Sequence, residues 1–184
     1  MTRLLRGQLG TEDNIETTLA AGARVVLLQS TIQQMSTGLG DLDREYYYKY
    51  GPADQDIGDD TYKTIQKTVN GRGLKPYSPV HVNSSTDGGG DITITWIRRT
   101  RIGGDSWDYT DDVPLNEAYE RYQVDVLDGG GSVVRTLSVT DTTEVAYTAA
   151  QQSTDGITVP FEVDVYQMSD QVGRGIARRA TING

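Results

Sequence analysis

The chain has no cysteine, a single histidine and a single phenylalanine among its 184 residues. Without cysteine it can form no disulfide framework, no thiolate zinc site and no thiol nucleophile. A Ser-His-Asp triad would depend on His81 alone, and a site with several histidine ligands is impossible. His81 lies in the alternating segment Val80–Val82, so we interpret it as an ordinary strand residue. We therefore expect a protein that is not an enzyme and that holds no cofactor or metal.

Positive charge is also scarce, because 17 Lys and Arg stand against 26 Asp and Glu, for a net charge of -9. This balance disfavours nucleic-acid binding. The densest basic cluster is Arg98, Arg99 and Arg101, and we expect nearby carboxylates to neutralise it, namely Asp105, Asp108, Asp111 and Asp112. No apolar run approaches the roughly 20 residues of a membrane span. The Leu4-Leu5 segment does not resemble a signal peptide, so we expect synthesis without a secretion signal.

Glycine and tyrosine are abundant, with 21 and 11 residues, and both suit a turn-rich β protein. Residues 74–184 contain about seven short alternating runs between turn signals, which is the pattern of an immunoglobulin-like antiparallel sandwich. One face of the second run carries Ile92, Ile94 and Trp96, so we expect Trp96 in the core. The predicted strands are Ser78–Val82, Asp91–Arg99, Arg121–Leu127, Val133–Val139, Glu144–Ala149, Phe161–Gln167 and Gly175–Ile182.

Residues 1–73 are predicted to form a separate, small β-rich subdomain that is part of a larger domain. It ends at the glycine-rich joint 70–73. Thr11–Leu19 can form one or two helical turns, and Ala21–Gln29 contains an apolar run of strand length. Asp43–Tyr50 and Thr61–Val69 are typical of strands, separated by an acidic turn. These few strands would build only a marginal core.

The polar segment Gly103–Asp112 is the candidate binding loop. Trp107 and Tyr109 form an aromatic pair among acidic residues, and with Asp105 and Asp108 they can contact a glycan or a protein. The alternative is that Trp107 folds back over one end of the sandwich. Calcium binding by the four aspartates is a further alternative, although their spacing matches no EF-hand. A carbohydrate-binding or carbohydrate-active module acting on bacterial envelope polysaccharide through these carboxylates is the rival function.

Several segments carry a resemblance to a known family. They are Leu4–Gln8, Gly10–Glu12, Ala21–Leu28, Tyr77–His81, Trp96–Arg101, Gly104–Trp107, Val113–Leu115 and Glu120–Tyr122. Together they resemble the C-terminal region of the tail-tip, baseplate hub or host-specificity proteins of siphophages and gene transfer agents. Tyr77–His81 is similar to the segment that leads into the fibronectin type III domain of those proteins.

The resemblance implies a fibronectin type III-like sandwich with Trp96 on its second strand and Phe161 at the tyrosine-corner position. Phenylalanine cannot make the corner hydrogen bond, and the connection from 151 to 160 looks irregular. The resemblance also implies an internal piece of a longer polypeptide within a virion-like tail particle assembled in the bacterial cytoplasm. Its implied partners are other tail or baseplate proteins, further copies of the chain, and a host-surface glycan or protein.

Overall fold

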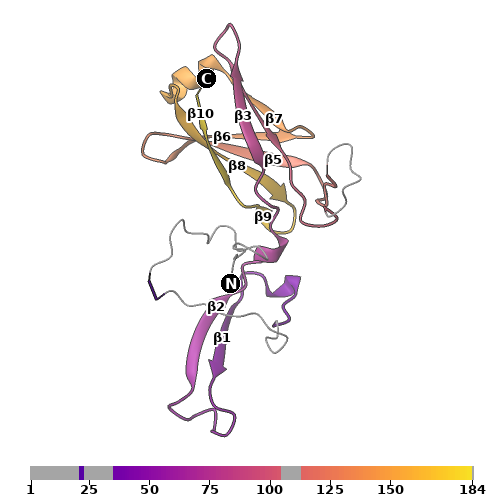
Figure 1. The fold of residues 1–184 in the computed structure, drawn as a ribbon, viewed down its shortest axis with the longest axis vertical. Coiled ribbons are helices and arrows are strands. Elements are labelled where there is room, and N and C mark those ends of the chain that lie inside the picture. Colours follow the sequence, from indigo (N-terminus) through magenta and orange to yellow (C-terminus); the bar gives the residue numbers. More distant parts are fainter. Residues whose placement is uncertain (1–20, 23–34, 105–112, 184) are drawn as a thin grey trace. The chain divides into compact units, whose positions relative to one another are not determined.

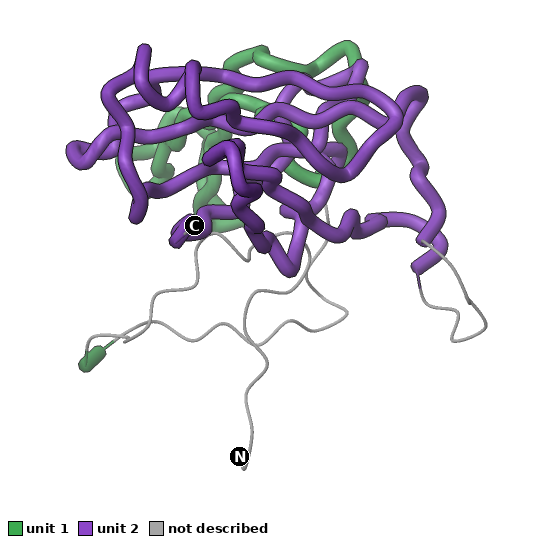
Figure 2. Tube along the Cα trace, turned by 90° about the horizontal axis from the view of Figure 1, so that it is seen from above, with its two compact units in different colours: residues 1–73 green, residues 74–184 purple. Residues whose placement is uncertain are grey.

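The computed structural model describes residues 21–22, 35–104 and 113–183. The chain divides into two compact units, residues 1–73 and residues 74–184, which Figure 2 colours separately. The predicted helical turns Thr11–Leu19 and most of the predicted strand Ala21–Gln29 lie outside the described residues. No helix of the described part is long and apolar enough to cross a membrane.

Residues 74–184 form a sandwich of two antiparallel sheets (Figure 1). One sheet has the order β3-β4-β7, built from Val80–Thr86, Ile92–Ile97 and Glu144–Tyr147. The other has the order β10-β8-β5-β6, built from Arg178–Ile182, Phe161–Ser169, Arg121–Leu127 and Val133–Thr140, and the short β9 (Gly173–Arg174) pairs with β8. Three strands facing four is a fibronectin type III-like arrangement of the immunoglobulin-like sandwich. The predicted all-β fold class is confirmed.

The core is made by strand residues that alternate toward the space between the sheets. Ile94, Val124 and Val163 are completely buried. Trp96 is 3% exposed, as predicted for a core residue, and its ring meets that of Tyr122 edge-on with centroids 5.1 Å apart. The apolar face of each predicted strand therefore supplies the packing that joins the two sheets.

Two glycine triplets form tight turns between strands. In each turn the side chain of the preceding aspartate accepts hydrogen bonds from two backbone N–H groups, Asp87 from Gly89 and Asp91, and Asp128 from Gly130 and Ser132. The last glycine of each triplet has a positive φ, 86° at Gly90 and 82° at Gly131. Glycine adopts this conformation without a steric penalty. Both triplets therefore act as tight turns between strands.

The connection between β7 and β8 is not irregular throughout, because Ala149–Asp155 forms a helix, α1. Thr148 and Gln151 make a reciprocal capping box, and Gly156 ends the helix with φ 68°. This helix has no buried residue, so its sequence has no apolar periodicity from which a helix could be predicted. The predicted strand Gly175–Ile182 started too early, because β10 begins only at Arg178. The N–H of Gly175 donates to the carbonyl oxygen of Gln167, and the N–H of Ile176 donates to the carbonyl oxygen of Pro76.

The described part of residues 1–73 contains one hairpin, β1 (Glu45–Tyr50) and β2 (Lys63–Thr68), and the short 3-10 helix η2 (Leu39–Asp41). A second 3-10 helix, η3 (Arg72–Leu74), spans the boundary between the two units. Both strands agree with the predicted segments Asp43–Tyr50 and Thr61–Val69. None of the described residues 35–73 is buried. The hairpin is thus a two-stranded sheet with solvent on both faces of the described structure.

Candidate functional site

The predicted binding residues Asp105, Trp107, Asp108 and Tyr109 lie outside the described residues, as do Asp111 and Asp112. Their proposed roles in glycan, protein or calcium binding therefore stay predictions. The structure does describe the residues on either side of this segment, 98–104 and 113–120.

These two flanks are joined by arginine contacts. Arg98 donates to the carbonyl oxygen of Val113 through Nε (3.0 Å) and Nη2 (2.7 Å), and its Nη1 lies 3.0 Å from Oε1 of Glu120. Arg101 Nε lies 3.4 Å from Oε1 of Glu117. Two glutamates that the sequence reasoning did not name thus neutralise Arg98 and Arg101. These contacts join residues 98–101 to residues 113–120. Neutralisation of the cluster by the four aspartates stays a prediction.

A polar network covers the outer face of the four-stranded sheet. Asp125 on β5 stands directly opposite Asp164 on β8, and their exposures are only 2% and 7%. Opposed like charges destabilise a sheet, and each carboxylate has its own guanidinium. Arg174 donates to both oxygens of Asp125 (2.5 and 3.0 Å), and Arg179 donates to both oxygens of Asp164 (3.0 and 2.7 Å).

Further contacts fix the guanidinium of Arg174. Its Nε donates to Gln123 at 2.7 Å, and its Cζ atom lies 4.6 Å from the ring centroid of Tyr166. The hydrogen bond to Asp125 raises the pKa of Arg174. Burial raises the pKa of the Tyr166 phenol, and the negative charges of Asp164 and Asp125 raise this pKa further. Since both carboxylates accept bidentate arginine bonds, the charges of Asp125 and Asp164 are each compensated within the described structure.

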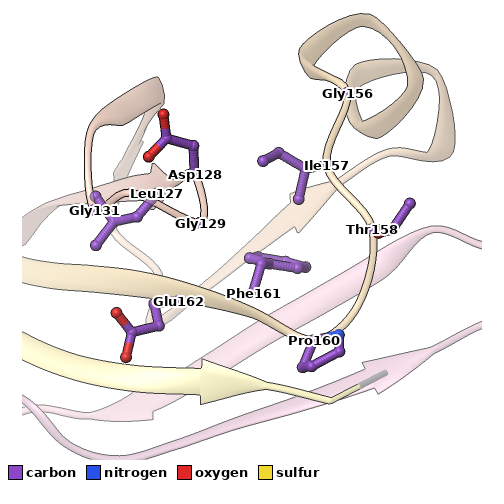
Figure 3. Close-up of a pocket in the computed structure, with 10 residues that line it drawn as sticks. All are labelled: Leu127, Asp128, Gly129, Gly131, Gly156, Ile157, Thr158, Pro160, Phe161 and Glu162. Atoms are coloured by element: carbon purple, nitrogen blue, oxygen red, sulfur yellow. The ribbon is translucent and has the colours of Figure 1, made fainter.

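A pocket of about 340 Å³ lies between the turn 127–131 and the segment 156–162 (Figure 3). Ile157 and Phe161 supply apolar surface, and Asp128 and Glu162 stand at its margin. Asp128 already caps its turn, and Glu162 lies 3.6 Å from Nη1 of Arg179. Both carboxylates at the pocket therefore already have partners, Asp128 in backbone N–H groups of its turn and Glu162 in Arg179.

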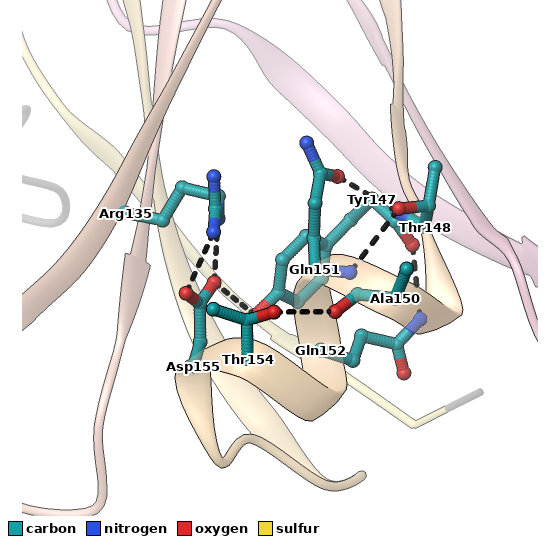
Figure 4. A network of polar contacts seen from close by, with 8 residues as sticks. All are labelled: Arg135, Tyr147, Thr148, Ala150, Gln151, Gln152, Thr154 and Asp155. Carbon is teal, nitrogen blue, oxygen red and sulfur yellow. Dashed lines mark hydrogen bonds and ion pairs between the residues drawn. The ribbon is translucent and has the colours of Figure 1, made fainter.

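A second network fixes helix α1 against the sandwich (Figure 4). The carboxylate of Asp155 accepts two bonds from Arg135 (2.5 and 2.7 Å) and one from the hydroxyl of Tyr147 (2.8 Å). The hydrogen bonds from Arg135 lower the pKa of Asp155. Burial, followed by the bond to Asp155, raises the pKa of Tyr147. The Tyr147 ring meets Phe161 edge-on at 5.7 Å, so a hydroxyl from β7 fixes this connection although Phe161 has none.

The remaining catalytic candidates do not form a site in the described structure. His81 lies on β3 at an irregularity between Val80 and Asn83, is exposed, and has φ 50°. Within residues 21–22, 35–104 and 113–183, no group of three or more His, Asp or Glu side chains is placed to hold a metal ion.

Sequence reasoning missed the networks around Asp125 and Asp155. The alternation of Gln123 and Asp125 with Tyr122 and Val124 does indicate an outward polar row. However, it does not reveal the strand register that sets Asp125 opposite Asp164. For Asp155, the Thr148–Gln151 capping-box pattern was the available signal.

No family model and no curated protein matches the chain. Among solved structures, the extracellular domains d3–d4 of rat CD45 match with 13% identity and a TM-score of 0.39, over 91% of this chain and 78% of that one. A myokine structure matches with 16% identity and a TM-score of 0.38 (59% and 96% covered). The FN5 domain of Drosophila Lar matches with 18% identity and a TM-score of 0.31 (59% and 98% covered). Similarities this distant give no information about the function of the chain. The assignment of the sandwich fold rests on the order of strands in the two sheets of the chain itself.

Proposed function

We propose that the chain is a non-enzymatic structural and recognition module of a phage-type tail tip, contributing to tail assembly and to host-surface attachment. The observation that carries this proposal is the hairpin β1–β2. Its residues Tyr47 and Tyr50 are 66% and 57% exposed and Ile65 is 41% exposed, while none of the described residues 35–73 is buried. A lone two-stranded hairpin is marginally stable in water. Such an element suits a component that neighbouring polypeptides complete.

The chemistry of the described residues agrees with a role without catalysis. The carboxylates of Asp125, Asp155 and Asp164 each accept arginine hydrogen bonds that fix strands or the helix. The sequence resemblance to tail-tip hub proteins supplies the location in the particle, with other baseplate proteins as partners.

Electron microscopy with antibodies against this chain tests the location. Tailed particles released from the bacterium that encodes the chain should carry the label at the distal tip. Antibodies against a tail-tube protein provide the control for access. Particles labelled along the tube by the control but unlabelled at the tip by the test antibody would contradict the proposal.

The rival enzymatic function has a direct test as well. Incubating the chain with bacterial envelope polysaccharide should release no oligosaccharide. Release that disappears in Asp105→Asn or Asp108→Asn would overturn the non-enzymatic assignment and make the 103–112 loop an active site.

A further inference from the structure

The pocket beside Phe161 has a lining without positive charge (Figure 3). Ten described residues line it, and none of these is Lys, Arg or His. Its two charged residues, Asp128 and Glu162, are both acidic. The whole chain has a net charge of -9, which adds to the negative potential at this pocket. An anionic ligand is therefore repelled, and a cation is attracted.

The charge of Asp128 has no cationic partner among the described residues. Its Oδ1 accepts hydrogen bonds from the N–H groups of Gly130 and Ser132, at 2.9 and 2.8 Å. Both donors are neutral, and within the described structure no hydrogen bond reaches Oδ2. One free carboxylate oxygen suits an ammonium group, which is a point charge, whereas a guanidinium prefers two oxygens side by side.

Glu162 adds to the negative charge because it shares its cation with another carboxylate. Nη1 of Arg179 lies 3.6 Å from Oε2 of Glu162. Two shorter bonds, of 3.0 and 2.7 Å, join Arg179 to Asp164. One guanidinium thus serves two carboxylates, and a net negative charge remains.

The C-terminal end of helix α1 favours the same sign of ligand. Gly156, the C-cap of α1, is part of the pocket lining. The last turn of α1 contains no basic residue, and the charge of Arg135, which contacts the helix, is balanced by that of Asp155. The carbonyl end of a helix carries a partial negative charge, which a cation stabilises.

The pocket also contains apolar surface, which a simple hydrated ion would leave uncovered. Ile157, Pro160 and Phe161 belong to the lining. In Figure 3 the side chain of Ile157 points toward the turn that carries Asp128, and the ring of Phe161 lies between the two segments in this view. The volume of about 340 Å³ is at the small end of the range for ligand pockets. It suits a short chain rather than a large ring system.

We propose that this pocket binds a primary ammonium group on a short alkyl chain. The ammonium donates to Oδ2 of Asp128, and the alkyl chain covers Ile157 and Phe161. The sources of such a group are a lysine side chain of another polypeptide and a free diamine. A metal ion fits less well, because among the described residues no three acidic or histidine side chains are placed to hold one. The site goes beyond the tail location proposed above, and neither depends on the other.

NMR titration of the isotopically labelled full chain tests the site. The probes are n-pentylammonium, 1-pentanol and pentanoate, which share the alkyl chain and differ in charge. Pentylammonium should shift the backbone signals of residues 127–131 and 156–162, with a dissociation constant of about 1–10 mM. The alcohol should bind at least fivefold more weakly, and pentanoate should shift none of these signals. Nα-acetyl-lysine N-methylamide and 1,5-diaminopentane should shift the same signals as pentylammonium, and the tighter of the two identifies the source of the group.

The chain offers a matched pair of variants, because its two glycine-triplet turns are built alike. Asp128→Asn removes the charge at the pocket, and asparagine can still accept the turn hydrogen bonds. Pentylammonium should then bind at least fivefold more weakly. The control, Asp87→Asn, makes the same change in the other turn, whose residues do not line the pocket, and should leave binding unchanged. Circular dichroism and thermal unfolding show whether both variants fold.

Three results would overturn the proposal. They are an absence of shifts in the pocket at about 100 mM pentylammonium, binding of 1-pentanol as tight as that of pentylammonium, and equal affinities of the two aspartate variants. The antibody-labelling experiment tests the tail location separately, so failure of the pocket and failure of the proposed function are distinguishable.

Discussion

Replacing Tyr147 by phenylalanine tests whether its hydroxyl fixes the connection that a tyrosine corner would otherwise hold. The Tyr147 side chain is fully buried, and its hydroxyl donates to Oδ2 of Asp155 at 2.8 Å. Hydrogen bonds to charged groups contribute about 1.5–3 kcal/mol, and Arg135 still satisfies Asp155 in the variant. The loss should therefore be about 1–2 kcal/mol of unfolding free energy. The edge-on contact with Phe161 is retained, so the change isolates the hydroxyl.

Urea unfolding followed by tryptophan fluorescence measures this loss, since Trp96 is in the core. With a denaturant slope of about 1–3 kcal/mol/M, the midpoint should fall by about 0.3–2 M. The matched control is Tyr119→Phe, at a ring that is 62% exposed, and its midpoint should be unchanged. Equal midpoints for the two variants would refute the role given to Tyr147.

The same variant has a pH signature. Burial and the bond to Asp155 raise the pKa of Tyr147, whereas an unfolded tyrosine titrates with a pKa of about 10. A raised folded-state pKa gives stability that is complete below pH ~10 and is lost as the pH rises toward the folded value. Between about pH 10 and 12 the original chain should therefore lose stability more steeply than Tyr147→Phe. Parallel losses would show that the hydroxyl is not the titrating group.

Three other changes have defined outcomes. Ile94→Val, in the core, should lower the unfolding free energy by about 0.5–1.5 kcal/mol in thermal melts. Its control, Ile97→Val, changes a side chain that is 51% exposed on the same strand and should leave the unfolding free energy unchanged. Equal losses in the two variants would contradict the burial pattern. Arg174→Met leaves the buried carboxylate of Asp125 without its cation, so it should lower the melting temperature more than Asp125→Asn does, and calorimetry showing the reverse order would contradict the network. Trp107→Ala should weaken binding to host envelope material at least tenfold without changing the melting temperature, and unchanged binding would remove that loop as the site.

The sequence predicted the strands of the sandwich because each has one strongly apolar face. β5 begins at Arg121 and ends at Leu127 as predicted, and the alternation through Trp96 correctly placed that ring in the core. Helix α1 escaped prediction because it buries no residue and so has no apolar period. The predicted start of the last strand, at Gly175, was wrong because the hydrogen bond from the Gly175 N–H to the Gln167 carbonyl depends on tertiary structure.

The polar networks were less predictable because they depend on register and on residues distant in sequence. An outward aspartate on β5 is expected to be exposed, yet Asp125 is 2% exposed. The reason is Arg174, 49 positions later, whose guanidinium covers it while stacking on Tyr166. Alternation predicts the face on which Asp125 lies, whereas its burial requires the pairing of β5 with β8 and the path of the chain after β8.

Among the described residues, the two units differ in how much apolar surface they bury. Every buried hydrophobic side chain of the described core lies in residues 74–184, so the sandwich has its own source of folding free energy. The hairpin β1–β2 has no comparable source within residues 35–73, although it exposes Tyr47, Tyr50 and Ile65. Apolar surface of this kind contributes free energy only when something covers it. Covering Tyr47, Tyr50 and Ile65 would therefore add folding free energy to the hairpin, whereas the sandwich already contains its own buried core.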